Sequence, residues 1–385
     1  MAGRPRDRLL SANETAGGGA YERAGVDYDT LDAGKRNALT EALATSPLLR
    51  AAPGGGRAID ESRGEPAFVF EAAGQTLAIV LECLGTKSLI ARALEGRCGA
   101  DGFDAVAYDT VAAVVNDLCC VGAVPLVVNA YFATGSSDWY AKPERQAGLL
   151  RGWRRGCEDA GATWGGGESP SLSGLVAADE IELAGSAVGI VPGGEPILGA
   201  ELSDGDEIVL VQSSGLHANG ASLARRIAAE LPHGYGFELP SGATFGEALL
   251  TPSLIYVPLV RALLGGGVAV HYLSHITGHG FLKLMRPRGS FTYEIDALPD
   301  VPEVLALLVA RAGMSPAEAY RTFNMGAGFA VYCAAGQGER VVSLARQCAL
   351  RAQVAGRVLA GPRRVVLTPV DVTFESGALD LAPRG

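Results

Sequence analysis

The feature that most constrains the fold is the alternation of short apolar runs with longer segments of helical periodicity. The runs are rich in β-branched residues and predict strands at residues 67–72, 76–85, 125–135, 180–191, 207–215, 323–334 and 363–375. The longer segments predict helices at residues 88–95, 106–122, 143–161, 219–231, 255–266, 301–313 and 338–354. Strands that alternate with helices are typical of sheets covered by helices. We therefore expect an α/β or α+β fold.

A segment rich in glycine and proline, residues 192–207, is the best candidate for a domain junction. With 385 residues, the chain is long enough for two domains of ordinary size. We place the boundary at residue 194, which gives domains at 66–194 and 195–385. Residues 1–65 are polar and weakly patterned, and we expect a variable, partly mobile N-terminal segment with regular structure beginning after Pro66.

The composition of the chain argues against two classes of binding partner, nucleic acids and membranes. The formal charge of −10 and the pI near 5.1 do not favour nucleic acid, which binds clustered Lys and Arg. Residues 110–128 are the most membrane-like run, but Asn116, Asp117 and Pro125 interrupt them. The seven cysteines form no CxxC pair and no disulfide framework, and the N-terminus has no apolar signal region. We therefore expect a cytoplasmic protein that contacts neither nucleic acid nor membrane.

The predicted helix 106–122 carries three polar residues on a small, apolar surface. Asp109 and Asn116 are seven residues apart, close to two turns, and so share a face, with Asp117 on its flank. Buried carboxylates need a cation or hydrogen-bond donors nearby, and oxygen ligands of this kind suit Mg²⁺. The alternative is that Asp109 caps the helix and Asp117 is solvated.

Two further segments suggest phosphate chemistry. In LGTK, residues 84–87, Lys87 lies at a predicted strand-to-helix turn, where backbone amides and an ammonium group suit a phosphate. In GGGES, Glu168 follows three glycines, so a ligand can reach its carboxylate without obstruction. The alternative for Lys87 is an ordinary surface lysine, since the chain contains no GxxxxGK[ST] loop.

Polar turns in the second half are candidate substrate contacts. SSGLHANG, residues 213–220, places Ser213, Ser214, His217 and Asn219 in a turn that opens a helix, which suits an anion and proton transfer but also a simple helix cap. HYLSHITGHG spaces three histidines by four residues, but its glycines predict a loop after a short strand, so zinc is disfavoured.

The stretch EAYRTFNMGAGF sets Arg321 and Asn324 between aromatic residues and adds Gly326 and Gly328. Glycine in a strand packs nothing and costs backbone entropy, so two in three residues indicate close approach of another group to the backbone.

Seven segments occur in the order and at the separations typical of the aminoimidazole ribonucleotide synthetase family, which the chain resembles over residues 21–375. They are YERAGVD, LGTK, VVNDL…GAVPL…YFATG, GGES, SDGDEIVLVQSSGLHANG, ITGHGF and YRTFNMGAGF. The resemblance implies two α/β domains, with strands of the first domain forming a barrel in a homodimer. It also implies ATP-dependent closure of formylglycinamidine ribonucleotide to aminoimidazole ribonucleotide in purine biosynthesis, through phosphorylation of the amide oxygen.

The resemblance also implies a set of site residues. ATP and Mg²⁺ are the implied cofactors. The implied ATP contacts are Gly85, Thr86, Lys87, Asn116 and Asp117, and the implied metal ligands are Glu82, Asp109, Asp117 and Glu168. The implied contacts to the nucleotide substrate are Ser213, Ser214, His217, Asn219, Thr277 and Gly278. The implied catalytic residues are Lys87, His217, Arg321 and Asn324, the last two lining the cleft between the domains.

The chain departs from the family's motifs in three places. Glu82 stands where the family has Asp, and Cys83 where it has Gly. No GGFG-like segment precedes this strand, and His279 replaces a glycine. Two alternatives stay open at this point: a divergent enzyme with the same phosphoryl-transfer core and another small substrate, or a paralogue that binds nucleotide or a partner without turnover.

Overall fold

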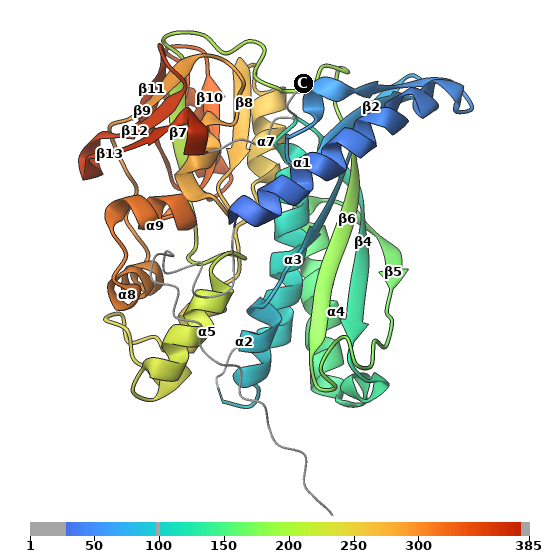
Figure 1. The fold of residues 1–385 in the computed structure, drawn as a ribbon, viewed down its shortest axis with the longest axis vertical. Coiled ribbons are helices and arrows are strands. Elements are labelled where there is room, and N and C mark those ends of the chain that lie inside the picture. Colours follow the sequence, from blue (N-terminus) through green and yellow to red (C-terminus); the bar gives the residue numbers. More distant parts are fainter. Residues whose placement is uncertain (1–27, 98–100, 379–385) are drawn as a thin grey trace, which may run out of the picture.

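The computed structural model describes residues 28–97 and 101–378, which form two β-sheets with helices packed against them (Figure 1). The first sheet has the order β1-β2-β3-β6-β4-β5. Its strands are β1 Gly56–Ile59, β2 Phe68–Ala72, β3 Gln75–Cys83, β4 Val124–Thr134, β5 Thr163–Glu168 and β6 Ile181–Ile190. Neighbouring strands are antiparallel except for the parallel pair β4 and β5. The predicted mixed α/β class is confirmed.

Two long helices, α3 (Gly102–Cys119) and α4 (Pro143–Ala160), cover one face of this sheet. Asp101 caps α3 by accepting a hydrogen bond from the Asp104 amide. Glycines on α4 let the two helices approach closely, because a Cβ at Gly152 would lie 2.0 Å from the Asp104 carbonyl oxygen. The short helix α2 (Lys87–Ala93) follows β3 directly. The polar residues of α3 are thus held on a nearly completely buried helix.

The second sheet has the order β13-β12-β9-β11-β7-β10-β8. Its strands are β7 Glu207–Gln212, β8 Val270–His275, β9 Phe291–Ile295, β10 Ala327–Cys333, β11 Ala352–Ala360, β12 Arg364–Leu367 and β13 Val372–Glu375. Its helices are α5 Ala221–Glu230, α6 Phe245–Leu249, α7 Val257–Gly265, α8 Glu303–Ala312, α9 Pro316–Thr322 and α10 Gly338–Gln347. Every residue of β10 is buried, as expected of a strand paired on both sides.

Three sequence expectations about the elements were wrong. Helix α1 (Tyr28–Thr45) and strand β1 precede Pro66, where we expected no regular structure. The predicted helix 338–354 ends at Gln347, and β11 begins at Ala352. The predicted strand 363–375 is two strands separated by a 3₁₀ turn at Thr368–Val370, where proline interrupts the ladder. Residues 1–27 of the predicted N-terminal segment lie outside the described residues.

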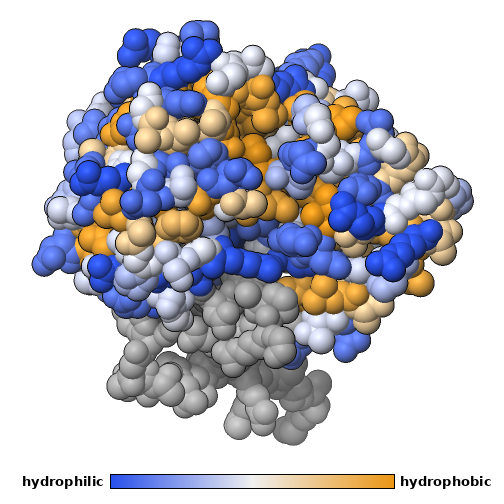
Figure 2. All heavy atoms as spheres, turned by 90° about the horizontal axis from the view of Figure 1, so that it is seen from above, coloured by the Kyte–Doolittle hydropathy of each residue, from blue (hydrophilic) through white to orange (hydrophobic). Residues whose placement is uncertain are grey.

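The connection between the two sheets runs from residue 191 to residue 206, and the boundary we predicted at residue 194 falls within it. No helix in the described ranges is long and apolar enough to cross a membrane. The upper face of the molecule has hydrophobic residues interspersed with hydrophilic ones (Figure 2).

Candidate functional site

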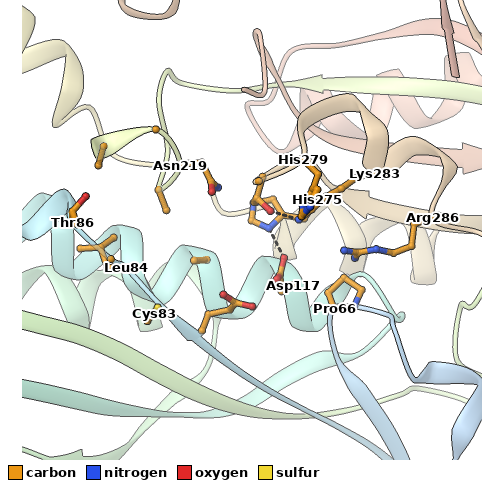
Figure 3. Close-up of a pocket in the computed structure, with 18 of the residues that line it drawn as sticks. Pro66, Cys83, Leu84, Thr86, Asp117, Asn219, His275, His279, Lys283 and Arg286 are labelled. Carbon is orange, nitrogen blue, oxygen red and sulfur yellow. Dashed lines mark hydrogen bonds and ion pairs between the residues drawn. The ribbon is translucent and has the colours of Figure 1, made fainter. Parts of the chain in front are cut away.

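A cavity of about 670 Å³ lies between the two halves of the chain (Figure 3). The first half contributes the segment 64–66, the end of β3 with the turn after it, and one face of α3. The second half contributes the start of α5 and the loop and 3₁₀ helix after β8. The lining includes Glu65, Glu82, Thr86, Asp117, Asn219, His275, Thr277, His279, Lys283 and Arg286.

The charges of this cavity are divided between its walls. Two carboxylates, that of Glu82 on β3 and that of Asp117 on α3, come from the first half of the chain. The two long cationic side chains, Lys283 and Arg286, come from the second half. Such a cavity is complementary to a metal-bound phosphate. The metal ion would face the carboxylates, and the phosphate oxygens would face the cationic side chains.

Asp117 and His275 form a buried pair across the two halves. Asp117 lies in the last turn of α3 and His275 at the end of β8, and their Oδ1 and Nδ1 atoms are 2.6 Å apart. Burial opposes ionisation of Asp117, but the hydrogen bond and charge of His275 outweigh it and lower the pKa of Asp117 to about 2. Burial lowers the pKa of His275 despite this carboxylate. The pair is therefore a carboxylate that accepts a hydrogen bond from a neutral imidazole near pH 7.

Lys283 and Arg286 come from the 3₁₀ helix Gly280–Met285 and the residue that ends it. The ammonium group of Lys283 donates a hydrogen bond to the Thr277 hydroxyl. Burial, followed by repulsion from Arg286, lowers the pKa of Lys283 to about 8. Within residues 28–97 and 101–378, Nε and Nη1 of Arg286 are buried without a hydrogen-bond partner.

Glu65 belongs to the segment that closes the cavity from the side of β2. The Tyr272 hydroxyl donates a 2.6 Å hydrogen bond to its Oε2. Burial raises the pKa of Glu65, although Arg286 and this hydrogen bond oppose the shift. Glu65, Lys283 and Arg286 were not predicted from the sequence. The sequence KLMR, residues 283–286, contains both cations. Without knowledge of the 3₁₀ helix, however, it does not indicate that they lie on the same wall of a cavity.

Lys87 does not line this cavity. Its side chain is fully buried, and Nζ donates to Asp109 Oδ2 at 2.5 Å and to the His217 carbonyl at 2.7 Å. Asp109 Oδ1 accepts a 2.7 Å hydrogen bond from the Ser253 amide. These bonds join the first half of the chain to the second. Lys87 and Asp109, predicted to contact phosphate and metal, are thus paired with each other.

Asn116 lies on the same face of α3 as Asp109, as their spacing predicted. Its Nδ2 donates to the Leu254 carbonyl and its Oδ1 accepts from the Tyr256 amide, each at 2.8 Å. Both ends of the amide therefore hold one backbone segment of the second half. Asn116 does not line the cavity, whereas Gly85, Thr86 and Asp117 of the predicted ATP contacts do.

The four predicted metal ligands are not gathered into one group. Glu82 and Asp117 line the cavity, Asp109 is paired with Lys87, and Glu168 is exposed at the end of the edge strand β5. Among the described residues, no three His, Cys, Asp or Glu side chains are close enough together to hold a metal ion. The histidines also separate, since His271 contacts Asp206 at 2.7 Å and His275 contacts Asp117.

The turn at residues 213–219 lies between two cavities. Asn219, together with Thr277 and Gly278, lines the first. Ser213 and Ser214 line a second cavity of about 600 Å³ beside β11 and α10.

His217 is buried between these cavities and lines neither. Its Nε2 accepts a hydrogen bond from the Ser214 amide at 3.1 Å. Burial lowers its pKa well below the ordinary value, so the ring is neutral. The predicted substrate contacts are therefore only partly brought together.

Asn324 is buried, and its side chain is hydrogen-bonded to the turn at residues 213–219. It donates to the Gly215 carbonyl and accepts from the Ser213 hydroxyl, each at 2.8 Å. Arg321, predicted beside it in the cleft, is exposed near the end of α9 and lines neither cavity.

The two glycines that follow Asn324 confirm close backbone approach. A Cβ would lie 2.3 Å from the Asp300 carbonyl oxygen at Gly326 and 1.9 Å from the Tyr256 hydroxyl at Gly328.

Among curated proteins, two archaeal ones are similar to this chain over most of its length. A protein of Methanothermobacter thermautotrophicus named phosphoribosylformylglycinamidine cyclo-ligase is 34% identical over 326 residues, covering 84% of this chain and 90% of the relative. A Methanobrevibacter smithii protein of the same name is 31% identical, covering 88% of this chain and 94% of the relative.

Solved structures share the fold at lower identity. Escherichia coli HypE, a hydrogenase maturation protein, has a TM-score of 0.55 at 16% identity, covering 80% of this chain and 87% of that one. A structure titled AaThiL complexed with AMPPCP and TMP has a TM-score of 0.54 at 17% identity, covering 81% and 90%.

Two family models cover most of the described chain. The model of the AIR synthase related protein N-terminal domain matches residues 64–191, and that of the C-terminal domain matches residues 203–368. With both domain models matched in order and a relative above 30% identity over most of its length, this chain belongs to the AIR synthase related protein family.

Proposed function

We propose that this protein is a phosphoribosylformylglycinamidine cyclo-ligase, which uses ATP to close formylglycinamidine ribonucleotide into aminoimidazole ribonucleotide in purine biosynthesis. The proposal is supported by relatives of that name along more than four-fifths of the chain. The observation that carries it is the cavity between the two halves, acidic on one wall and basic on the other. Phosphoryl transfer needs that arrangement because it develops charge on several oxygens at once.

The reaction divides into two steps. The amide oxygen of the substrate attacks the terminal phosphorus of ATP, and ADP leaves. A substrate nitrogen then attacks the activated carbon, the C–O bond breaks with release of phosphate, and the nitrogen loses a proton. Holding the two substrates in register within one cavity would supply much of the rate enhancement.

The basic wall would hold the phosphoryl oxygens. Lys283 and Arg286 place positive charge on this wall, and the turn before α5 adds Asn219. The turn after β3 contributes Gly85 and Thr86, which we propose contact ATP.

The acidic wall fits Mg²⁺, which usually binds through one or two carboxylates plus substrate phosphates. Glu82 and Asp117 line the same cavity and are the residues we propose to hold it. Bound there, Mg²⁺ would offset the negative charge that develops on the phosphoryl group.

His275 is suited to accept the proton that the attacking nitrogen loses. Its Nδ1 is directed to Asp117, which fixes the ring and its tautomer. Its pKa is lowered by burial, so the ring is neutral at neutral pH, and with Nδ1–H donating to Asp117 the unprotonated Nε2 can accept a proton. The ring lines the cavity, as Figure 3 shows.

The open face of the first sheet supports the homodimer that we propose. Helices α3 and α4 cover one face, while apolar residues of β2, β3, β4 and β6 occupy the other. Leu81 is 71% exposed, Leu126 45% and Ile79 39%. An apolar sheet face of this kind is expected to be covered by a partner, and a second copy with the same face would cover it.

Turnover of the named substrate tests the activity. Purified protein with formylglycinamidine ribonucleotide, ATP and Mg²⁺ should yield ADP, phosphate and aminoimidazole ribonucleotide in equal amounts, measured by liquid chromatography with mass detection. ATP binding without formation of the imidazole product would contradict the proposal.

A further inference from the structure

Arg286 carries buried donor atoms that the fold itself does not satisfy. Its Nε and Nη1 are both shielded from solvent and, in the described part of the chain, neither has a hydrogen-bond partner. Buried polar groups are almost always paired, and a charged donor left unpaired is especially costly. Because the side chain lines the cavity between the two halves, a ligand in that cavity can supply the acceptor.

Lys283 provides a second donor on the same side. A 3₁₀ helix has three residues per turn, so residues three apart, such as Lys283 and Arg286, lie above one another. Lys283 is 7% exposed and lines the same cavity, and the Thr277 hydroxyl takes one of its three donor positions. Burial and the positive charge of Arg286 both lower the pKa of Lys283, and an anion bound between the two side chains would offset this repulsion.

Two of the neighbouring carboxylates, Glu65 and Asp117, already accept a hydrogen bond from another residue. Glu65 accepts the hydroxyl of Tyr272, and Asp117 accepts the ring N–H of His275. Both carboxylates help to raise the pKa of Arg286, while the hydrogen bonds just named join them to Tyr272 and His275. The two cations therefore still have donors for an incoming oxyanion.

We propose that Lys283 and Arg286 form a phosphate subsite on the second-half wall of the cavity. The bidentate fork of Arg286 would hold two oxygens of a phosphate group, and the ammonium of Lys283 a third. The existence of the subsite does not depend on the proposed function. The identity of the bound phosphate does rest on it, because the proposed reaction supplies two candidates, ATP and the ribonucleotide substrate.

Binding of inorganic phosphate tests the subsite. Isothermal titration calorimetry on the full chain with Mg²⁺ should show phosphate binding that weakens at least about tenfold in Arg286→Gln and in Lys283→Gln, since each removes a charge-assisted hydrogen bond. Arg286→Lys should retain part of the affinity. The matched control is Arg311→Gln, which removes the same charge from an exposed position on α8 and should bind like the wild type. Circular dichroism would verify that each variant is folded.

The outcomes separate the subsite from its source and from the activity. Displacement of phosphate by the ATP analogue AMPPCP alone assigns the subsite to the triphosphate, and displacement by ribose 5-phosphate alone assigns it to the ribonucleotide. Displacement by neither marks an adventitious ion only and overturns the proposal, as does equal binding by the wild type and both variants or no binding by the wild type. Failure of the cyclo-ligase assay with intact, Arg286-dependent phosphate binding would reject the proposed function and leave the subsite standing.

Discussion

Lys87 illustrates how a residue in a phosphate-like motif can serve a different purpose. The sequence LGTK placed it at the start of α2 as predicted, but its ammonium group turns inward to Asp109 and the His217 carbonyl. These buried polar groups therefore join the two halves of the chain. The sequence could not show this, because the partner His217 is 130 residues away.

Replacement of Lys87 by methionine should mainly destabilise the protein. The change leaves the Asp109 carboxylate buried without its cation, which costs about 3–5 kcal/mol of the free energy of unfolding. Urea unfolding measures this loss. The control, Lys142→Met, removes a half-exposed lysine paired with Asp179 and should cost less than about 1 kcal/mol. A Lys87→Met protein as stable as the wild type but inactive would instead support the predicted contact to phosphate.

Asp117 should make stability depend on acidity. Its pKa is lowered to about 2 from an ordinary value of 3.8, so its contribution is complete above about pH 5 and is lost as the pH falls towards 2. Between pH 5 and pH 3 the wild type should lose about 1 kcal/mol of unfolding free energy through this group. Asp117→Asn should lack that part of the loss, as followed by urea unfolding at both pH values.

The exposed Asp138 provides the control for this experiment. Asp138→Asn should follow the wild-type dependence on pH. If Asp117→Asn also kept the wild-type dependence, the carboxylate would not be held in the charged state by His275.

At the scale of elements, α3 connects the two halves of the molecule. Its inward face presents Asp109 and Asn116 to the backbone of residues 253–256, and its last turn presents Asp117 to His275. One helix thus positions both the contact between the halves and the acidic wall of the cavity.

Removal of the Asn116 side chain should loosen this contact. Asn116→Ala leaves the Leu254 carbonyl and the Tyr256 amide without partners, at a cost of about 2–4 kcal/mol. Hydrogen exchange followed by mass spectrometry should show faster exchange of the Tyr256 amide. Asn37→Ala, an exposed change on α1, is the control and should leave that exchange unaltered. Unchanged exchange in Asn116→Ala would contradict the role of this helix face.

Predictability differed among elements for physical reasons. The bounds of β4, β6 and α3 were predicted within a few residues, because long buried elements have a clear pattern of apolar residues. Strand β5 was missed since three glycines in TWGGGE erase the pattern, and α1 since its apolar residues form no clear stripe. The basic wall of the cavity was not predicted, because Lys283 and Arg286 are brought onto it by a 3₁₀ helix too short to produce a recognisable hydrophobic pattern.

At the scale of the whole molecule, the two halves contribute opposite charges to one cavity. Neither half holds both the acidic wall and the basic wall, so the site exists only when the contact through α3 is made. The open sheet face lies on the side of the first sheet opposite α3, which leaves it available to a second copy.

A charge on the open sheet face should separate the proposed dimer. Leu81→Lys places an ammonium group on the apolar face, where a partner would have to bury it. Analytical ultracentrifugation should show a dimer for the wild type and a monomer for Leu81→Lys. The same substitution at the exposed Leu264 on α7 is the control and should leave the dimer intact. A wild-type monomer would contradict the proposed assembly.

The fate of the substrate's amide oxygen tests the central claim most directly. With formylglycinamidine ribonucleotide labelled with ¹⁸O at that amide, a single turnover with ATP should place the label in the released inorganic phosphate, as seen by mass spectrometry. This follows because the oxygen that attacks phosphorus leaves with it when the ring closes. Release of the label as water, with unlabelled phosphate, would contradict phosphoryl activation in this cavity.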